Sequence, residues 1–248
     1  MSCEALIAAG GFGTRMSESL NPSNNKSLIE YGGQTLIGHL IDSLRDGGIE
    51  RFVFSSGYHN FEAIKEEVKK KQIDAIVVPY YGEYRKIPYV WRDLLDEQFL
   101  FVCGHQPLTP EFVSEMIEAS KKADSVITAY DNLKYPIRKE HKILYRKDLG
   151  KIVLTPVNTK EDNIEDSHCY IRNPYFIKKK LIDFAEKEDF RYTFSYYIYL
   201  DWKEGGSLAV IESPVPPEFD YDDEFQMTKD FLDEKKVSID VSDLSDGH

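Results

Sequence analysis

A glycine-rich segment near the N-terminus has the residue types and spacing of an anion-binding loop. AAGGFGTR, at residues 8–15, directly follows the short apolar run EALIAA. Glycine lets the backbone approach a ligand closely, and successive N–H groups in such a turn form a concave site for anions. Arg15 adds a planar cation that matches phosphate oxygens, and Lys26 adds a second positive charge further along the chain. The segment therefore predicts a binding site for a polyphosphate.

Two other phosphate-binding loops fit this segment poorly. It has no Gly-Lys-Ser/Thr sequence to make a P-loop, its glycines are not spaced as GxGxxG, and no clear acidic ribose-binding residue ends the second expected strand. A plainer alternative stays open, in which the glycines only form a tight turn between a strand and a helix.

A second candidate site lies where an apolar run stops in polar residues. FLFVCGHQPLTPEF, at residues 99–112, reads as a strand that ends at Gly104 and His105, followed by a helix that starts near Pro110. Ligands of open α/β sheets bind at the carboxyl ends of the strands, so His105 is a candidate binding residue.

The acidic segment FDYDDEF, at residues 219–225, offers carboxylates that could hold a metal ion. Asp220 and Asp222 are the candidate ligands. Asp222 or Asp223 could instead cap the helix that follows, with Glu224 in its first turn. Both interpretations stay open, since each can hold for a different residue.

These residues must be positioned by the elements around them, which alternate in type over residues 4–130. Short apolar runs typical of buried strands alternate with segments of helical periodicity. This pattern predicts an α/β fold with a doubly wound, mostly parallel, Rossmann-like sheet and helices on both faces. After residue 130 the pattern loosens into a small α+β C-terminal lobe, with a hairpin in HKILYRKDLGKIVLTPV and a helix from about Pro174 to Lys187. We expect one domain over residues 1–235 and an acidic, flexible tail at residues 236–248.

Composition excludes several classes of function. A formal net charge of −12 argues against nucleic-acid binding, which needs a basic surface. No apolar run approaches the roughly 20 residues that cross a bilayer, and no basic segment precedes the first apolar stretch as in a signal peptide. The three cysteines are far apart and read as reduced thiols. We therefore expect a cytoplasmic protein that acts on small molecules, with a homo-oligomer left open.

The opening third of the chain resembles a known family. AAGGFGTRM, then NKSLIEYGGQTLIGHLIDSL, then FVFSSGYHNFEAIKEEV are similar to sugar-1-phosphate nucleotidyltransferases and to MobA-like NTP transferases, which share a GT-A-type fold. FDYDDEF is similar to the late acidic segment of the same family. The resemblance covers residues 4–60 well and extends to about residue 130.

The resemblance implies a function and a set of residues. Such enzymes transfer a nucleotidyl group from an NTP to a phosphorylated acceptor and release pyrophosphate, with a divalent metal, Mg2+ or Mn2+, at the phosphates. It implies that residues 1–130 bind the nucleotide and residues 131–235 the acceptor, and that Arg15 and Lys26 are the catalytic residues. The implied metal ligands are His105, Asp220 and Asp222. The implied nucleotide-binding residues are Ala8, Ala9, Gly10, Gly11, Gly13, Thr14, Arg15 and Lys26.

His105 is a departure from the family pattern, because it stands where the resemblance places a metal-binding aspartate. Three interpretations stay open: a ligand for a softer ion than magnesium, a contact to substrate, or the mark of a relative that binds nucleotide or NDP-sugar without turnover. The chain is thus expected to be an NDP-sugar-forming nucleotidyltransferase, with a binding protein as the alternative. A glycosyltransferase is a further, weaker alternative, since a shared sheet does not decide function.

Overall fold

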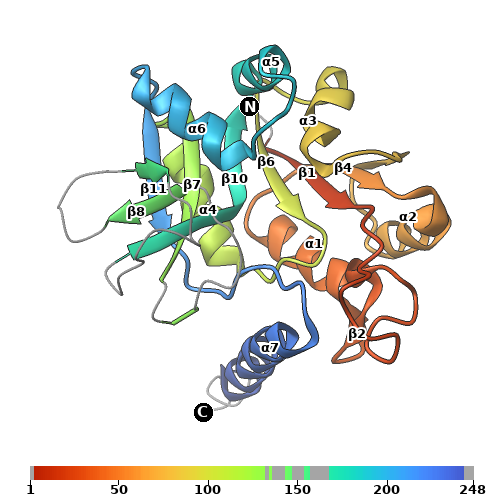
Figure 1. Cartoon of the computed structure of the whole chain (residues 1–248). Coiled ribbons are helices and arrows are strands. Elements are labelled where there is room, and N and C mark those ends of the chain that lie inside the picture. Colours follow the sequence, from red (N-terminus) through yellow and green to blue (C-terminus); the bar gives the residue numbers. More distant parts are fainter. Residues whose placement is uncertain (1–2, 132–133, 136–142, 147–153, 157–167, 243–248) are drawn as a thin grey trace.

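The computed structural model describes residues 3–131, 134–135, 143–146, 154–156 and 168–242. Within them, strands run side by side in the order β11-β7-β10-β6-β1-β4-β5 (Figure 1). β8 pairs with β10, and β9 pairs with β8. A separate two-stranded sheet joins β2 and β3. The strands are β1 (Glu4–Ala9), β2 (Glu30–Tyr31), β3 (Gln34–Thr35), β4 (Arg51–Ser56), β5 (Ala75–Pro79), β6 (Gln98–Cys103), β7 (Ser125–Asp131), β8 (Ile143–Arg146), β9 (Leu154–Pro156), β10 (His168–Lys178) and β11 (Leu208–Glu212).

The main sheet is mostly parallel, as the alternating pattern predicts. β1 pairs in parallel with both β4 and β6, β4 pairs with β5, and β11 pairs with β7. Only β10, among the strands of the central path, is antiparallel to its neighbours β6 and β7. The carboxyl ends of β1, β4 and β6 therefore meet at one edge of the sheet, where the candidate site lies.

Helices cover both faces of the sheet, because successive side chains of each strand point to opposite sides. Ala5, Ile7 and Ala9 of β1 pack with α1, α2 and α4 in one core cluster, whereas Leu6 and Ala8 pack with α3, α5 and α6 in another. This confirms the doubly wound fold. The helices are α1 (Leu36–Asp46), α2 (Phe61–Lys70), α3 (Ile87–Val90), α4 (Pro110–Ser120), α5 (Lys180–Lys187), α6 (Phe194–Lys203) and α7 (Asp222–Ser242).

Side-chain caps set where two helices next to the site begin. The Thr35 hydroxyl accepts a hydrogen bond from the Gly38 N–H at the start of α1, and Thr109 accepts one from the Phe112 N–H at the start of α4. Each cap satisfies an N–H group that has no partner within its own helix. The helix start near Pro110 is thereby confirmed, and it fixes the turn that carries His105.

The C-terminal part joins the main sheet more fully than the sequence suggests. The helix expected from about Pro174 to Lys187 is wrong in its first half, because β10 continues to Lys178 and α5 starts only at Lys180. Phe176 and Ile177 are instead held as strand residues against β6 and are almost fully buried there. The expected hairpin is present in its described residues, as the antiparallel pair β8 and β9.

The last helix, α7, lies beside the N-terminal β2 region (Figure 1). Phe219 and Phe225 pack with Met16, Ile29 and Leu36 in a small core cluster of their own. α7 continues to Ser242, within the stretch 236–248 predicted as a tail, and residues 243–248 lie outside the described residues, so the tail stays a prediction. None of the helices among the described residues combines the length and the apolar character that crossing a membrane would need.

Candidate functional site

A cleft of about 830 Å³ opens at the carboxyl ends of β1, β4 and β6. The glycine loop, Lys26 and His105 line it, as the sequence predicts. Residues from later in the chain complete it, namely the segment 80–84 after β5 and the side chains of Asn173, Glu218 and Asp220. A single concave surface therefore brings together the glycine loop, the strand-end histidine and the late acidic segment.

A close backbone approach explains Gly10, and a positive φ angle explains Gly13. A Cβ atom at Gly10 would lie 2.8 Å from the Gly57 backbone nitrogen, so only glycine lets the loops after β1 and β4 touch. Gly13 has a φ angle of +60°, and a Cβ there would lie 2.4 Å from Asn21 Nδ2. A Cβ at Gly11, in contrast, would meet nothing within 4 Å. Gly10 and Gly13 shape the loop, and Gly11 leaves open space in the cleft.

Lys26 reaches into the cleft from the short 3-10 helix η1 (Lys26–Leu28). Asn25 starts this turn, because its side chain accepts from the Ser27 N–H and donates to the Ala9 carbonyl at 2.8 Å. Lys26 is only 7% exposed, and its Nζ donates to Asp220 Oδ1 at 2.6 Å and to the Phe219 carbonyl at 2.7 Å. Burial lowers the pKa of Lys26 to about 8, although neighbouring acidic groups such as Glu218 oppose that shift.

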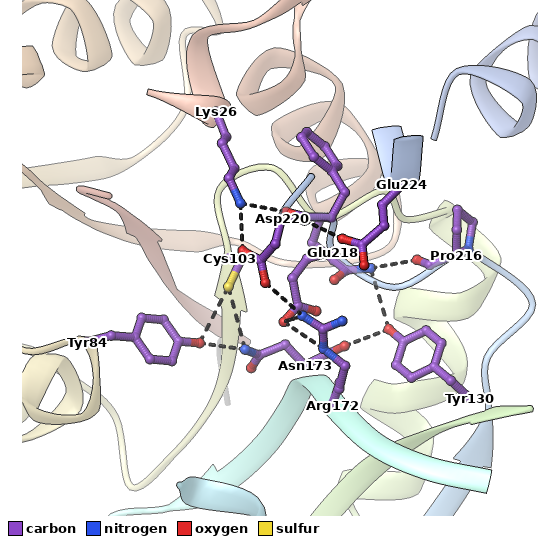
Figure 2. Close-up of polar contacts among 12 residues, drawn as sticks. Lys26, Tyr84, Cys103, Tyr130, Arg172, Asn173, Pro216, Glu218, Asp220 and Glu224 are labelled. Atoms are coloured by element: carbon purple, nitrogen blue, oxygen red, sulfur yellow. Dashed lines mark hydrogen bonds and ion pairs between the residues drawn. The ribbon is translucent and has the colours of Figure 1, made fainter. Parts of the chain in front are cut away.

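Asp220 lies between cations from three separate segments. Lys26 and Arg172 approach its carboxylate from opposite sides (Figure 2), and Arg15 Nη1 lies 3.3 Å from Asp220 Oδ2. Arg172 is the most distant of the three, at 3.8 Å. Glu224 holds the backbone here, since its Oε2 accepts from the N–H of Asp220 at 2.7 Å. Arg15 and Lys26, the predicted phosphate-binding cations, thus converge on one point.

The far end of the cleft is a buried polar network that the sequence did not predict. Arg172 donates from Nη2 and Nε to Glu218 Oε1, at 2.7 and 3.1 Å. Asn173 Nδ2 donates to the Tyr84 hydroxyl and to Cys103 Sγ (Figure 2). Burial raises the pKa of the Cys103 thiol to about 12, so this thiol is neutral at physiological pH and is not a nucleophile.

Of the predicted nucleotide-binding residues, all but one line the cleft. Ala8, Gly10, Gly11, Gly13, Thr14, Arg15 and Lys26 are on its wall. Ala9 is not, because its side chain faces the opposite side of the sheet and packs into the core, while its carbonyl supports Asn25. The period of two along β1 could have separated Ala8 from Ala9 in the sequence.

The three predicted metal ligands are not assembled into one site. His105 and Asp220 line the cleft, and the His105 ring meets the Phe219 ring edge to face with centroids 5.1 Å apart. Asp222 accepts a hydrogen bond from the Ser17 N–H at 3.0 Å and is not among the cleft-lining residues. No group of three or more His, Cys, Asp or Glu side chains in the described part of the chain is arranged to hold a metal ion.

Sequence reasoning missed Glu218, Arg172, Asn173 and Tyr84. Glu218 had the clearest signal, because it lies two residues before Asp220 and directly precedes the acidic segment. Arg172 and Asn173 interrupt an otherwise apolar and aromatic stretch, CYIRNPYF, which is a weak sign of a functional role. Nothing in the neighbourhood of Tyr84 along the chain indicates its contact with Asn173.

The model of the MobA-like NTP transferase domain family matches residues 5–162 of this chain. The chain belongs to this family. The resemblance inferred from the glycine loop is confirmed at that level. The matched segment contains the loop, Lys26 and His105, whereas Arg172, Glu218 and Asp220 lie beyond it.

Curated relatives match part of the chain. The bifunctional protein GlmU of Symbiobacterium thermophilum is 30% identical over 133 residues, which is 50% of this chain and 27% of the relative. The UTP–glucose-1-phosphate uridylyltransferase AglF of Haloferax volcanii is 28% identical over 117 residues, covering 41% of this chain and 42% of the relative. Each match spans less than half of the relative's own length.

Solved structures share the fold over nearly the whole chain. The inositol-1-phosphate CTP transferase of T. maritima superposes with a TM-score of 0.69 at 15% identity, covering 92% of this chain and 96% of that one. The 4-diphosphocytidyl-2C-methyl-D-erythritol synthase of Anaerococcus prevotii gives a TM-score of 0.64 at 18% identity, covering 94% and 96%. At such identities the likeness establishes the fold and leaves the substrates open.

Proposed function

We propose that this protein is a nucleotidyltransferase that transfers an NMP group from an NTP to a sugar phosphate or a related phosphorylated acceptor, with release of pyrophosphate. The observation that carries the proposal is the convergence of Arg15 and Lys26 beside a glycine loop in one cleft. Membership of the NTP transferase family and the names of its relatives support it.

The nucleotide would lie on the side of the cleft formed by the loops after β1, β4 and β5. Backbone N–H groups of the glycine loop would bind phosphate oxygens, and Gly11 leaves room for them. Arg15 and Lys26 would exchange part of their contact with Asp220 for the triphosphate. Their charge would be placed where negative charge is redistributed as pyrophosphate departs.

The acceptor would approach from the opposite side, near Asn173 and Glu218. Its phosphate oxygen would attack the α-phosphorus of the NTP, and the bond from that phosphorus to the β-phosphate oxygen would break. No covalent intermediate with the protein is needed, and the neutral Cys103 thiol supplies no nucleophile. Catalysis of this kind rests on positioning and on neutralisation of charge.

A divalent metal, Mg2+ or Mn2+, would be held by Asp220, whose carboxylate is a hard oxygen donor on the cleft wall. His105 is a second candidate ligand, better matched to Mn2+ than to Mg2+. When bound, the ion would neutralise charge on the triphosphate. Since the described residues hold no three-ligand group, the remaining ligands would come from the phosphates and water.

The direct test is pyrophosphate release with each of four NTPs and a panel of sugar 1-phosphates, in Mg2+ and in Mn2+. We expect release with at least one pair, and a drop of about 10²–10³ in kcat/KM for Lys26→Ala, because a preorganised positive charge is lost. Lys70→Ala is the matched control, since Lys70 is exposed on α2 and outside the cleft.

One result would count against catalysis, and another would count against the role proposed for Lys26. Saturable NTP binding without pyrophosphate from any pair would favour the alternative of a nucleotide-binding relative, with His105 as the first residue to exchange for aspartate. Equal activity of Lys26→Ala and Lys70→Ala would reject the role given to the glycine-loop side of the cleft.

A further inference from the structure

Exposed aromatic rings gather at one end of the cleft. Phe12 is 44% exposed and Tyr81 is 73% exposed, and both line the cleft. A third exposed ring, Tyr58, belongs to the 3-10 helix η2 (Tyr58–Asn60) after β4 and is not a lining residue. Clustered exposed apolar side chains commonly mark a ligand-binding groove or an interaction site.

Phe12 is the ring that the glycine loop itself presents. It lies between Gly11 and Gly13, which carry no side chains. The ring is stacked on His59, with centroids 4.0 Å apart and planes 8° from parallel. Tyr81 meets Phe12 edge to face, with centroids 6.4 Å apart. Phe12 is therefore supported from behind by an imidazole and flanked by a second ring, yet it stays partly exposed.

The support under Phe12 depends on the close approach of two loops. Gly10 and Gly57 touch so closely that neither backbone leaves room for a side chain, since a Cβ on Gly57 would lie 2.7 Å from the Gly10 carbonyl oxygen. This contact brings His59 beneath the glycine loop. The stack is thus built into the fold and does not rest on a chance meeting of surface side chains.

The cleft has different chemistry at its two ends. The end near Arg172, Glu218 and Asn173 is buried, charged and hydrogen-bonded. The end near Phe12 and Tyr81 is aromatic and exposed. Arg15 and Lys26 are the cations suited to phosphates. Arg15 follows Phe12 by three residues, and Lys26 packs against Gly13 of the same loop. A planar group joined to a polyphosphate would therefore meet Phe12 first.

We propose that Phe12, backed by His59 and flanked by Tyr81, is the stacking platform for the nucleobase of the bound NTP. This inference rests on the proposed function and adds a residue that selects for a nucleotide over a bare polyphosphate. Every base has a π face, so stacking tolerates all four bases. The platform raises affinity for any NTP, and groups at the edge of the base make the choice among them.

The test compares NTPs with inorganic tripolyphosphate, which has the phosphates and no base. Dissociation constants are measured by calorimetry in Mg2+ for ATP, CTP, GTP, UTP and tripolyphosphate. Phe12→Leu keeps an apolar side chain and removes the ring. For each NTP that the wild type binds, we expect Phe12→Leu to lower the affinity by about tenfold or more. The affinity for tripolyphosphate should stay unchanged.

Three variants complete the design. Phe12→Trp keeps a ring and should retain NTP affinity. Tyr81→Ala should lose less NTP affinity than Phe12→Leu, because Tyr81 and Phe12 meet only edge to face. Tyr58→Ala removes an exposed ring outside the cleft and should leave the affinity for NTPs unchanged.

The outcomes separate this inference from the proposed function. Unchanged NTP affinity in Phe12→Leu, or an equal loss for tripolyphosphate, overturns the platform and leaves the nucleotidyltransferase proposal standing. A wild-type protein that binds no NTP overturns both. Loss of affinity for NTPs alone, restored in Phe12→Trp, supports the platform.

Discussion

The two ends of the cleft are built in different ways. The Phe12 end is made by two loops of neighbouring strands, where the glycine loop after β1 touches the loop after the parallel strand β4. The Glu218 end is made from side chains that converge from separate segments, with Arg172 from β10 and Tyr84 from the segment after β5. The first end depends on close backbone contact between two loops, and the second on side chains that pack together from several elements.

This difference has an energetic consequence. The aromatic end exposes its rings, so an altered ring there leaves the rest of the core untouched. At the polar end, Arg172 and Glu218 have side chains only 14% and 12% exposed. A buried ion pair that loses one partner leaves an uncompensated charge, and its low-dielectric surroundings make that charge costly.

The largest expected effect follows from breaking that pair. Arg172→Met should lower the free energy of unfolding by about 3–5 kcal/mol, because Glu218 is left buried without its cation. Urea denaturation at neutral pH measures the change. Phe12→Leu is the comparison at the other end and should stay within about 0.5 kcal/mol of the wild type.

The double variant Arg172→Met with Glu218→Leu sharpens this prediction. Removing both charges should recover most of the lost stability, since replacing a buried pair by apolar groups is often nearly neutral. If Arg172→Met were as stable as Phe12→Leu, the two ends would not differ in the way described.

A smaller effect separates two adjacent glycines of the loop. Gly10→Ala should cost about 1–3 kcal/mol, because its Cβ would lie 2.8 Å from the Gly57 nitrogen and the two loops must move apart. Gly11→Ala should leave stability unchanged within about 0.5 kcal/mol, because its Cβ would meet nothing within 4 Å. Thermal unfolding of both variants is the measurement, and equal destabilisation would contradict the loop geometry.

The smallest expected effect on stability concerns the ion cluster of Asp124 with Lys178 and Lys180. This cluster is more exposed than the buried pair of Arg172 and Glu218. Hydrogen bonds from Lys178 and Lys180 hold the pKa of Asp124 below its usual range. A lowered pKa means that this stabilisation is complete above the ordinary aspartate pKa and is lost as the pH falls below it. Because solvent screens these charges, Asp124→Asn should lower the free energy of unfolding by only about 1 kcal/mol at pH 7.

Chemical denaturation from pH 7 down to pH 2 checks this sign. Between pH 5 and pH 2 the wild type should lose stability faster than Asp124→Asn, so their difference should shrink. A difference that grows as the pH falls would reject the assignment.

Much of the fold could be predicted from local patterns. The alternation of apolar runs with helical segments indicated the parallel sheet with helices on both faces, and Thr109 and Pro110 indicated the start of α4. β10 could not be predicted in the same way. Its Tyr175, Phe176 and Ile177 were expected in a helix, and pairing with β6 and β7 overrides that local preference.

The candidate site likewise contains residues that local patterns predict and residues that only long-range contacts bring together. Arg15, Lys26 and most of the glycine loop were predicted from their spacing along the chain, and they line the cleft, while their binding roles stay a prediction. Glu218, Arg172 and Asn173 were missed, since each becomes informative only beside the others. Asp222 was proposed as a metal ligand, but it binds the Ser17 N–H, and carboxylates that are close in sequence can face different ways.

The sequence by itself determined the family, the parallel sheet and the glycine loop that lines the cleft, because each is read from local patterns along the chain. The tertiary structure decided what surrounds that loop: Asp220 between three cations, His59 behind Phe12, and Arg172 against Glu218. These partners are remote along the chain. The pairing of β1 with β4 brings His59 to Phe12, whereas β10 and the return of the chain before α7 bring Arg172, Glu218 and Asp220 into contact.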